Sequence, residues 1–197
     1  ESGAPALVDL DGDDDLDLVV GSCVDDLTTK DKDGNDCSWY REECVAMEDD
    51  DGAGPPGGFY YYDNTTYCPL GAFDNCGAFD DDDFTSSELC CACGGGKGVI
   101  SYYENVGRAS SAQFKARNGS SNPFDSLEVE TYATPLFADV DNDGDVDLVL
   151  GGSSGALQYF ENNGNSTAPV FIARVGGANP FASVDVHARS APALIDY

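Results

Sequence analysis

Short apolar runs separated by turn-forming residues make up much of the second half of the chain. Leu148-Val-Leu and Leu157-Gln-Tyr-Phe are each bounded by Gly, Asn or Asp. Such runs are too brief for helices and have the length of buried or half-buried strands. Four strands of about five residues joined by tight turns would form an antiparallel, blade-like sheet. The pattern predicts these strands over 135–139, 146–151, 156–161 and 169–173.

The same pattern occurs twice along the chain. Residues 98–140 align without a gap on residues 155–197 at a shift of 57, and residues 5–21 align on residues 135–151 at a shift of 130. The two shifts differ by 73 residues, the length of the cysteine-rich stretch 24–96. A repeat of 57 residues is therefore predicted, with an insertion between the second and third strands of its first copy. Identical pairs include Tyr102/Tyr159, Glu104/Glu161, Asn105/Asn162, Gly107/Gly164, Phe114/Phe171 and Asn122-Pro-Phe/Asn179-Pro-Phe.

The alignment gives the expected organisation. The first repeat is split over 1–22 and 97–133 by the insert 23–96, and the second repeat spans 134–190. Residues 191–197 form the first strand of a third repeat, because 188–197 replays 1–10 with five identical positions. The expected fold class is all-β, with four-stranded antiparallel blade-like repeats and a disulfide-rich, irregular insert. The repeats would form an open tandem stack or part of a β-propeller.

Two acidic nonapeptides lie between the first and second strands of the repeats. Residues 9–17 and 139–147 each place aspartates at positions 1, 3, 5, 7 and 9. A tight turn near the middle would wrap these carboxylates around one point, where Ca²⁺ takes six to eight oxygens at about 2.3–2.6 Å. Gly144 suits that bend because glycine permits positive φ, whereas Asp14 stands there in the first copy, whose site is expected to be strained or weaker. The loop is not an EF-hand, since its twelfth position falls inside a strand and is not Glu.

Side-chain ligands are assigned to positions 1, 3, 5 and 9 of each nonapeptide, and a backbone carbonyl to position 7. The alternative is a solvated acidic turn, which two copies with the same five acids disfavour. Asp31-Lys-Asp-Gly-Asn lacks the flanking strands and is predicted to be a solvated turn. The candidate metal-site residues are Asp9, Asp11, Asp13, Asp15, Asp17, Asp139, Asp141, Asp143, Asp145 and Asp147, with Asp196 at the first ligand position of a third repeat.

These residues carry a family resemblance. The segment 137–151, Phe-Ala-Asp-Val-Asp-Asn-Asp-Gly-Asp-Val-Asp-Leu-Val-Leu-Gly, resembles an FG-GAP or VCBS-type repeat, as do Tyr159-Phe-Glu-Asn-Asn-Gly and Asn179-Pro-Phe. The resemblance implies four-stranded blades of β-propellers, as in integrin α-subunits, with calcium in the loop between the first two strands. It implies the same ligands, with Asp15 and Asp145 offering carbonyls. The chain departs from the family in having two full repeats, whereas a closed propeller needs several blades.

All eight cysteines lie in one window rich in Gly and Asp. An even count in such a stretch predicts a disulfide-stapled module, and Cys91-Ala-Cys93 is poorly spaced for a zinc knuckle. Eight cysteines allow 105 pairings, so the connectivity stays open. The segments 33–40 and 83–96 are similar to small cysteine-rich modules in secreted proteins of algae and other protists. The predicted disulfide residues are Cys23, Cys37, Cys44, Cys68, Cys76, Cys90, Cys91 and Cys93.

Composition limits the classes of molecule that the chain could bind. With 9 Lys+Arg against 37 Asp+Glu, the net charge of -28 argues against nucleic acid as a partner and against adsorption to an anionic membrane surface. No apolar run approaches the roughly 18 residues of a spanning helix, so no membrane insertion is expected. Asp accounts for 28 of the 37 acidic residues. Aspartate is common in turns, and hard cations bind to its carboxylate oxygens there. Sequons at Asn64, Asn118 and Asn165 join the cysteines in predicting a secreted, glycosylated protein of the cell surface or an extracellular filament.

The leading hypothesis is a non-catalytic, calcium-binding extracellular repeat glycoprotein with a structural or adhesive role. Its copies or repeats would join head to tail into a fibre or a longer tandem array. The alternative is a ligand- or glycan-binding β-propeller segment of a larger secreted protein, lectin-like or integrin-like, that contacts glycans or other extracellular proteins. An enzyme is not expected, because paired acids such as Asp13 and Asp15 are committed to a cation. His187 aligns with Glu130 and is predicted to lie on the surface.

Overall fold

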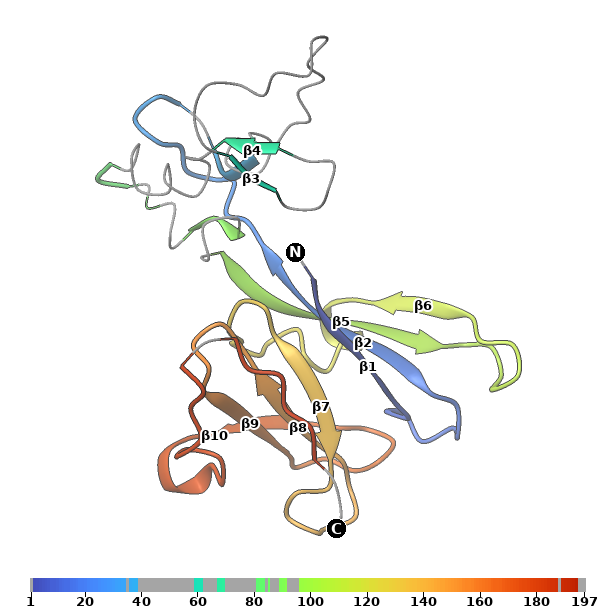
Figure 1. Cartoon of the computed structure of the whole chain (residues 1–197). Helices are drawn as coiled ribbons and strands as arrows, with labels where there is room; N and C mark the ends of the chain where they lie inside the picture. Colours follow the sequence, from blue (N-terminus) through green and yellow to red (C-terminus); the bar gives the residue numbers. More distant parts are fainter. Residues whose placement is uncertain are drawn as a thin grey trace. The chain divides into compact units, whose positions relative to one another are not determined.

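The computed structural model describes residues 2–34, 36–38, 59–61, 67–69, 81–83, 85, 89–91, 96–187 and 189–194. The chain separates into two compact units (Figure 1). One consists of Glu1–Cys23 and Gly98–Tyr197, and the other of Val24–Lys97. The stretches predicted to form the two repeats lie in the first of these units, apart from Lys97, and the second unit holds the predicted insert, apart from Cys23.

Two four-stranded antiparallel sheets form the first compact unit. Sheet 1 has the strand order β1-β2-β5-β6 and sheet 2 the order β7-β8-β9-β10. The all-β class and the four-stranded antiparallel sheets are therefore confirmed, and the strand ends of sheet 2 differ from the expected ones by one or two residues. The strands of sheet 1 are β1 (Ser2–Val8), β2 (Asp17–Val24), β5 (Lys97–Asn105) and β6 (Phe114–Arg117); those of sheet 2 are β7 (Thr134–Ala138), β8 (Asp147–Gly151), β9 (Leu157–Asn162) and β10 (Phe171–Arg174).

The first strand of each sheet is an edge strand that contains proline. Pro5 lies in β1 and Pro135 in β7, and proline suits an edge because it has no N–H to donate to a ladder. The ladder of β1 with β2 ends at the pair Val8↔Asp17, and that of β7 with β8 ends at Ala138↔Asp147. Each acidic nonapeptide therefore forms the turn between the first two strands of its sheet.

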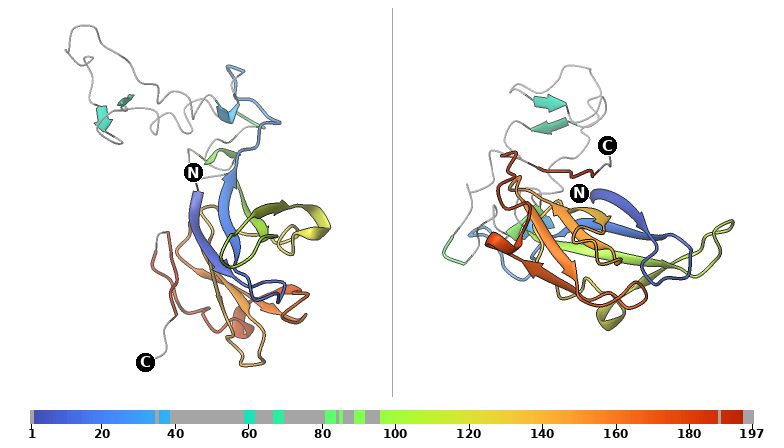
Figure 2. Two further views of the ribbon diagram at one scale, coloured as in Figure 1. Left: turned by 90° about the vertical axis from the view of Figure 1, so that its right-hand side faces the viewer. Right: turned by 90° about the horizontal axis from the view of Figure 1, so that it is seen from below.

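The two sheets share one hydrophobic core, and Figure 2 shows them from two further sides. Phe124, in the connection that follows β6, stacks on Phe171 of β10 with ring centroids 5.2 Å apart. The same ring lies 5.9 Å from that of Phe137 in β7. The Asn-Pro-Phe motif of the first repeat thus supplies the residue that joins the sheets. The cluster comprises Val8, Leu10, Val19, Ile100, Tyr102, Phe124, Leu148, Leu150, Phe160 and Phe171.

Among the described residues of the first compact unit, the helical elements are two short 3₁₀ turns, η2 (Gly119–Ser121) after β6 and η3 (Gly176–Ala178) after β10. None of the helices among the described residues is long and apolar enough to cross a membrane. Within the same residues the two sheets close into neither a barrel nor a propeller.

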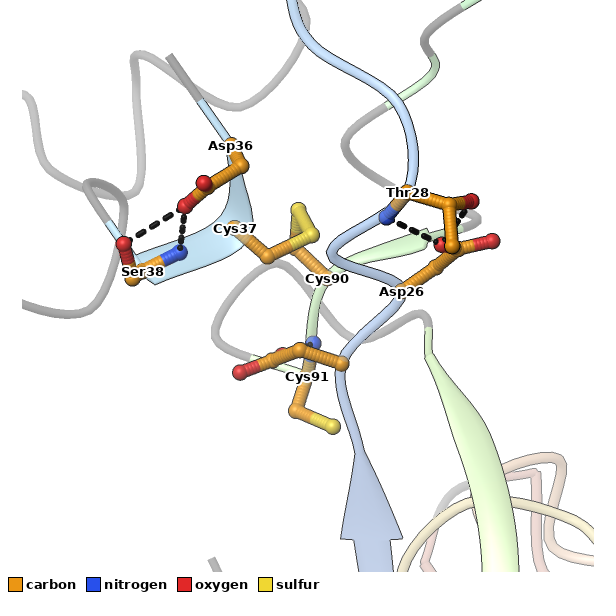
Figure 3. Close-up of a disulfide and its surroundings, with 8 residues drawn as sticks. Asp26, Thr28, Asp36, Cys37, Ser38, Cys90 and Cys91 are labelled. Carbon is orange, nitrogen blue, oxygen red and sulfur yellow. Dashed lines mark hydrogen bonds between the residues drawn. A yellow bond between two sulfur atoms is a disulfide. The ribbon is translucent and has the colours of Figure 1, made fainter.

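The second compact unit contains a short hairpin and a disulfide. Strand β3 (Phe59–Tyr61) pairs antiparallel with β4 (Tyr67–Pro69). Cys37 and Cys90 form a disulfide that spans 53 residues of sequence (Figure 3). Disulfide bonding is also found at Cys23 and Cys91. Cys44, Cys76 and Cys93 lie outside the described residues, as does the side chain of Cys68.

The segment from Asp31 forms the expected turn, in which the N–H of Gly34 donates to the Asp31 carbonyl over 2.8 Å. The prediction that this turn is solvated is wrong for Asp31, which is 4% exposed. Its Oδ1 accepts the N–H of Asp33 over 2.9 Å, so the carboxylate helps to close the turn.

Candidate metal centre

The two acidic turns have the same backbone conformation. Positions 4 and 6 have positive φ in both, at Gly12 (75°) and Asp14 (70°) in the first turn and at Asn142 (64°) and Gly144 (100°) in the second. The bend expected at position 6 is present, and Asp14 adopts it without glycine. The second left-handed position was missed, although Gly12 and Asn142 are residue types that tolerate it.

The aspartate at position 1 holds each turn together. Asp9 accepts backbone N–H groups from Gly12 at 2.8 Å and from Asp14 at 3.0 Å, one on each carboxylate oxygen. Asp139 does the same with the N–H groups of Asp143 and Gly144, both at 3.1 Å. These bonds use the short reach of Asp, which closes turns where Glu cannot. A carboxylate oxygen has further lone pairs, so such bonds leave position 1 able to bind a cation.

The aspartate at position 9 is buried and accepts three hydrogen bonds. Asp17 is 1% exposed and accepts the N–H of Leu10 at 3.2 Å, the hydroxyl of Tyr102 at 3.0 Å and the N–H of Asn105 at 2.7 Å. Both donors from β5 come from beyond the insert. Position 9 therefore ties the acidic turn to the third strand of the sheet.

Sheet 2 repeats this arrangement around Asp147, which is also 1% exposed. Its donors are the N–H of Val140 at 3.0 Å, the hydroxyl of Tyr159 at 2.9 Å and the N–H of Asn162 at 2.8 Å. Burial and the adjacent carboxylate raise the pKa of the Tyr159 hydroxyl, so it stays a donor. Sequence reasoning missed the tyrosine, although its identity with Tyr102 at a shift of 57 was the available signal.

Three carboxylates converge in each turn, but the sets differ. Oxygens of Asp9, Asp11 and Asp13 lie within 4.8 Å of one another in the first turn. In the second turn the same holds for Asp139, Asp141 and Asp147. Each turn thus gathers three of its four predicted side-chain ligands, which leaves Asp17 and Asp143 outside these sets. Asp15 and Asp145, predicted to offer carbonyls, lie half-buried.

The aspartate at position 3 has a raised pKa in both turns. Burial first, and then the charges of Asp17 and Asp13, raise the pKa of Asp11. Burial followed by the charges of Asp143 and Asp147 raises the pKa of Asp141. The Oδ1 atom of Asp11 is buried and has no hydrogen-bond partner among the described residues. The residues of the first turn therefore fit a hard divalent cation, which takes oxygen ligands and would satisfy this atom.

A charged pair closes the last hairpin of each sheet. Arg117 of β6 donates two hydrogen bonds of 2.6 Å to Glu104 of β5, and Arg174 of β10 donates at 2.8 and 2.7 Å to Glu161 of β9. The arginine lowers the pKa of each glutamate, chiefly through these bonds. Both pairs are forked contacts, the strongest form of this interaction. The identities at a shift of 57 indicated both residues but not their contact.

The other predicted site residues fall in several places. Asn118 and Asn165 are exposed. In the second of these sequons, Asn165 Oδ1 accepts the Thr167 hydroxyl at 2.9 Å. Asn64 and Asp196 lie outside the described residues. His187 is exposed, as predicted.

Comparisons of the chain with protein-family models, with curated proteins and with solved structures find no match. The FG-GAP or VCBS resemblance therefore stays a prediction from the motifs, and the repeat geometry rests on the two sheets themselves.

Proposed function

We propose that this chain is a non-catalytic, calcium-binding extracellular repeat protein whose sheets continue in head-to-tail series in a structural or adhesive assembly. The observation that carries the calcium assignment is the acidic turn, present twice with the same backbone. The buried Oδ1 of Asp11, which has no hydrogen-bond partner among the described residues, supports the assignment, because a bound cation would satisfy this oxygen. The Cys37–Cys90 disulfide and the disulfide bonding of Cys23 and Cys91 are consistent with an oxidising, extracellular setting.

The ion would act as a structural link within each sheet. The first acidic turn holds six aspartates within nine residues and the second holds five; these carboxylates repel one another, and the protein as a whole carries a net charge of -28. A divalent cation bound by Asp9, Asp11 and Asp13, or by Asp139, Asp141 and Asp147, offsets this repulsion. Because the turn joins the first two strands, the fold becomes linked to calcium concentration.

The experiment is calcium titration calorimetry with thermal unfolding in calcium and in chelator. Asp11→Asn and Asp141→Asn remove one charge from each turn and keep its shape, and Asp125→Asn removes an exposed charge outside both turns. We expect two calcium sites in the wild type, one in each turn variant and two in the control. A higher melting temperature in calcium should accompany them. Equal binding by all four proteins, or no binding at all, would refute the assignment.

Glycan or ligand binding by a propeller segment is the second candidate. No contact among the described residues favours it over a structural role. A glycan array read with the calcium-loaded protein separates the two, because specific binding would require a site beyond the turns.

A further inference from the structure

We propose that a second copy of this chain docks its sheet 1 against the outer side of sheet 2, through a repeat of the contact that joins the two sheets within one chain. The inference rests on the proposed function, since it names the surface by which the series continues. Each sheet has two faces, which we call trailing and leading. In sheet 1 the trailing side is the face that packs against sheet 2, and in sheet 2 the leading side is the face that packs against sheet 1. The equivalent face of the other sheet takes the same name in each case.

The contact within the chain is apolar on both sides. The trailing side of sheet 1 presents Phe124 to the leading side of sheet 2, where the ring lies beside those of Phe137 and Phe171. Leu127 and Val129, in the same connection, pack against the shared core. The leading side of sheet 2 comprises Phe137, Leu148, Leu150, Phe160 and Phe171.

The leading side of sheet 1 has the same apolar character, and its described residues are more exposed than their counterparts in sheet 2. The shifts of 130 and 57 place Leu7 opposite Phe137 and Phe114 opposite Phe171 in the alignment. Leu7 is 59% exposed and Phe114 is 46% exposed. The remaining counterparts, Leu18, Val20 and Tyr103, are half-buried.

The second strands show the same contrast. All five residues of β8 are buried, whereas β2 alternates buried and half-buried residues from Asp17 to Ser22. A strand buried on one face only belongs to a sheet with a second face available for packing. Apolar side chains gathered on one exposed sheet face are typical of interaction surfaces.

The trailing side of sheet 2 presents the matching residues. Phe181, Val184 and Val186 are the counterparts of Phe124, Leu127 and Val129. Val184 is 42% exposed and Val186 is 58% exposed, and Phe181 is half-buried where Phe124 is 2% exposed.

Both Asn-Pro-Phe motifs are anchored in the same way. The Nδ2 group of Asn122 donates to a β5 carbonyl at 3.0 Å, and that of Asn179 donates to a β9 carbonyl at 3.0 Å. Phe124 meets Tyr102 edge-on at 6.3 Å, and Phe181 meets Tyr159 edge-on at 6.0 Å. Phe181 is thus already held in the orientation with which Phe124 enters sheet 2. In the proposed contact it enters between Leu7 and Phe114 of the next copy.

The terminal segment follows the same path. The carbonyl of Ser190 lies against Gly151 as that of Ala133 lies against Gly21, and both glycines leave no room for a Cβ. Residues 191–194 repeat residues 4–7 of β1 but belong to no strand in the described part of the chain. In the proposed contact, β1 of the incoming copy takes the place that residues 191–194 would otherwise fill as a first strand. We expect this because β1 is already paired with β2 in its own chain.

The contact is heterologous, because leading and trailing sides differ, and such contacts grow into open series. None of Leu7, Phe114, Phe181, Val184 and Val186 is charged, whereas the whole chain carries -28. Association is therefore expected to strengthen as salt screens the repulsion between copies.

The test uses the full chain in calcium, with size measured by light scattering and particle shape by electron microscopy. Phe181→Asp places a charge on the trailing side and Phe114→Asp places one on the leading side. Val175→Asp is the matched control, because Val175 is 79% exposed and its counterpart Asn118 is exposed although sheet 1 packs against sheet 2. We expect linear oligomers for the wild type and the control, and monomers for each Phe variant alone.

An equimolar mixture of the two Phe variants provides the decisive measurement. Each retains one intact side, so the mixture should form dimers of one copy of each variant and nothing longer. Deletion of 191–197 should leave the wild-type oligomers in place. Monomeric wild type, a mixture that stays monomeric, or loss of oligomers on the deletion would overturn the proposal. Calcium titration of the same samples tests the proposed function separately, since oligomers without calcium sites, or sites without oligomers, distinguish the two.

Discussion

The hydroxyl of Tyr102 in β5 donates a hydrogen bond of 3.0 Å to Asp17 at the start of β2, across 85 positions of sequence. Tyr159 and Asp147 repeat the contact at 2.9 Å across only 12 positions. The same local geometry therefore forms with and without the insert between the strands. The insert lengthens the loop between second and third strands but leaves the sheet and the base of its acidic turn intact.

Replacement of Tyr102 by Phe should destabilise sheet 1. The variant keeps the ring and removes a donor from the buried Asp17 carboxylate, and a hydrogen bond to a charged group contributes about 1.5–3 kcal/mol. Tyr159→Phe should lower the free energy of unfolding by a similar amount in sheet 2. Urea unfolding checks both. Tyr103→Phe is the control, because its side chain points to the other face of β5. An equal loss of stability in that variant would show that the bond to Asp17 is not the cause.

The pair of Glu104 and Arg117 should make stability depend on pH in a defined direction. Arg117 lowers the pKa of Glu104 below its ordinary value of 4.5 in the folded protein. A carboxyl group with a lowered folded pKa stabilises the fold above its unfolded pKa, and that contribution is lost as pH falls through the folded value. Urea unfolding of the wild type and Glu104→Gln should differ at neutral pH and converge in acid. A constant difference down to acid pH would contradict the assignment.

The local pattern of the chain was sufficient for the strands and the acidic turns, because both depend on nearby residues. Apolar runs bounded by turn residues located the strands, and alternate aspartates located the turns. The burial of Asp17 was not predictable in this way, since its donors Tyr102 and Asn105 lie beyond the insert. Phe124 and Phe181 share a motif but differ in burial, because burial depends on which sheet lies opposite and not on the motif.

Gly144 offers a test of the backbone of the second acidic turn. Its φ is 100° and a Cβ there would meet nothing within 4 Å, so Gly144→Ala carries a conformational penalty without a clash. Left-handed conformations cost an L-residue about 1–2 kcal/mol, and Asn or Asp less. Thermal unfolding in chelator should show a loss of stability for Gly144→Ala and a smaller loss for Gly144→Asp. The first turn has an aspartate, Asp14, at the equivalent position. Gly177→Ala is the control, because Gly177 also has open space but no positive φ. Equal effects at both glycines would mean that the turn does not require its left-handed position.

The disulfide of Cys37 and Cys90 should stabilise the second compact unit alone. It closes a loop of 53 residues, for which loop entropy gives about 4 kcal/mol. Removing it by Cys37→Ser with Cys90→Ser should expose amides within Val24–Lys97 to hydrogen exchange, because both cysteines lie in that unit and outside the strands of the two sheets. Amides of β8 and β9 should keep their protection, since their ladder and core contacts are unchanged. Cys23 lies in β2 and is disulfide-bonded, so full reduction is a harsher treatment than the double variant and should also affect the end of that strand. Loss of protection in β8 and β9 on the double substitution would show that the sheets need the insert in order to fold.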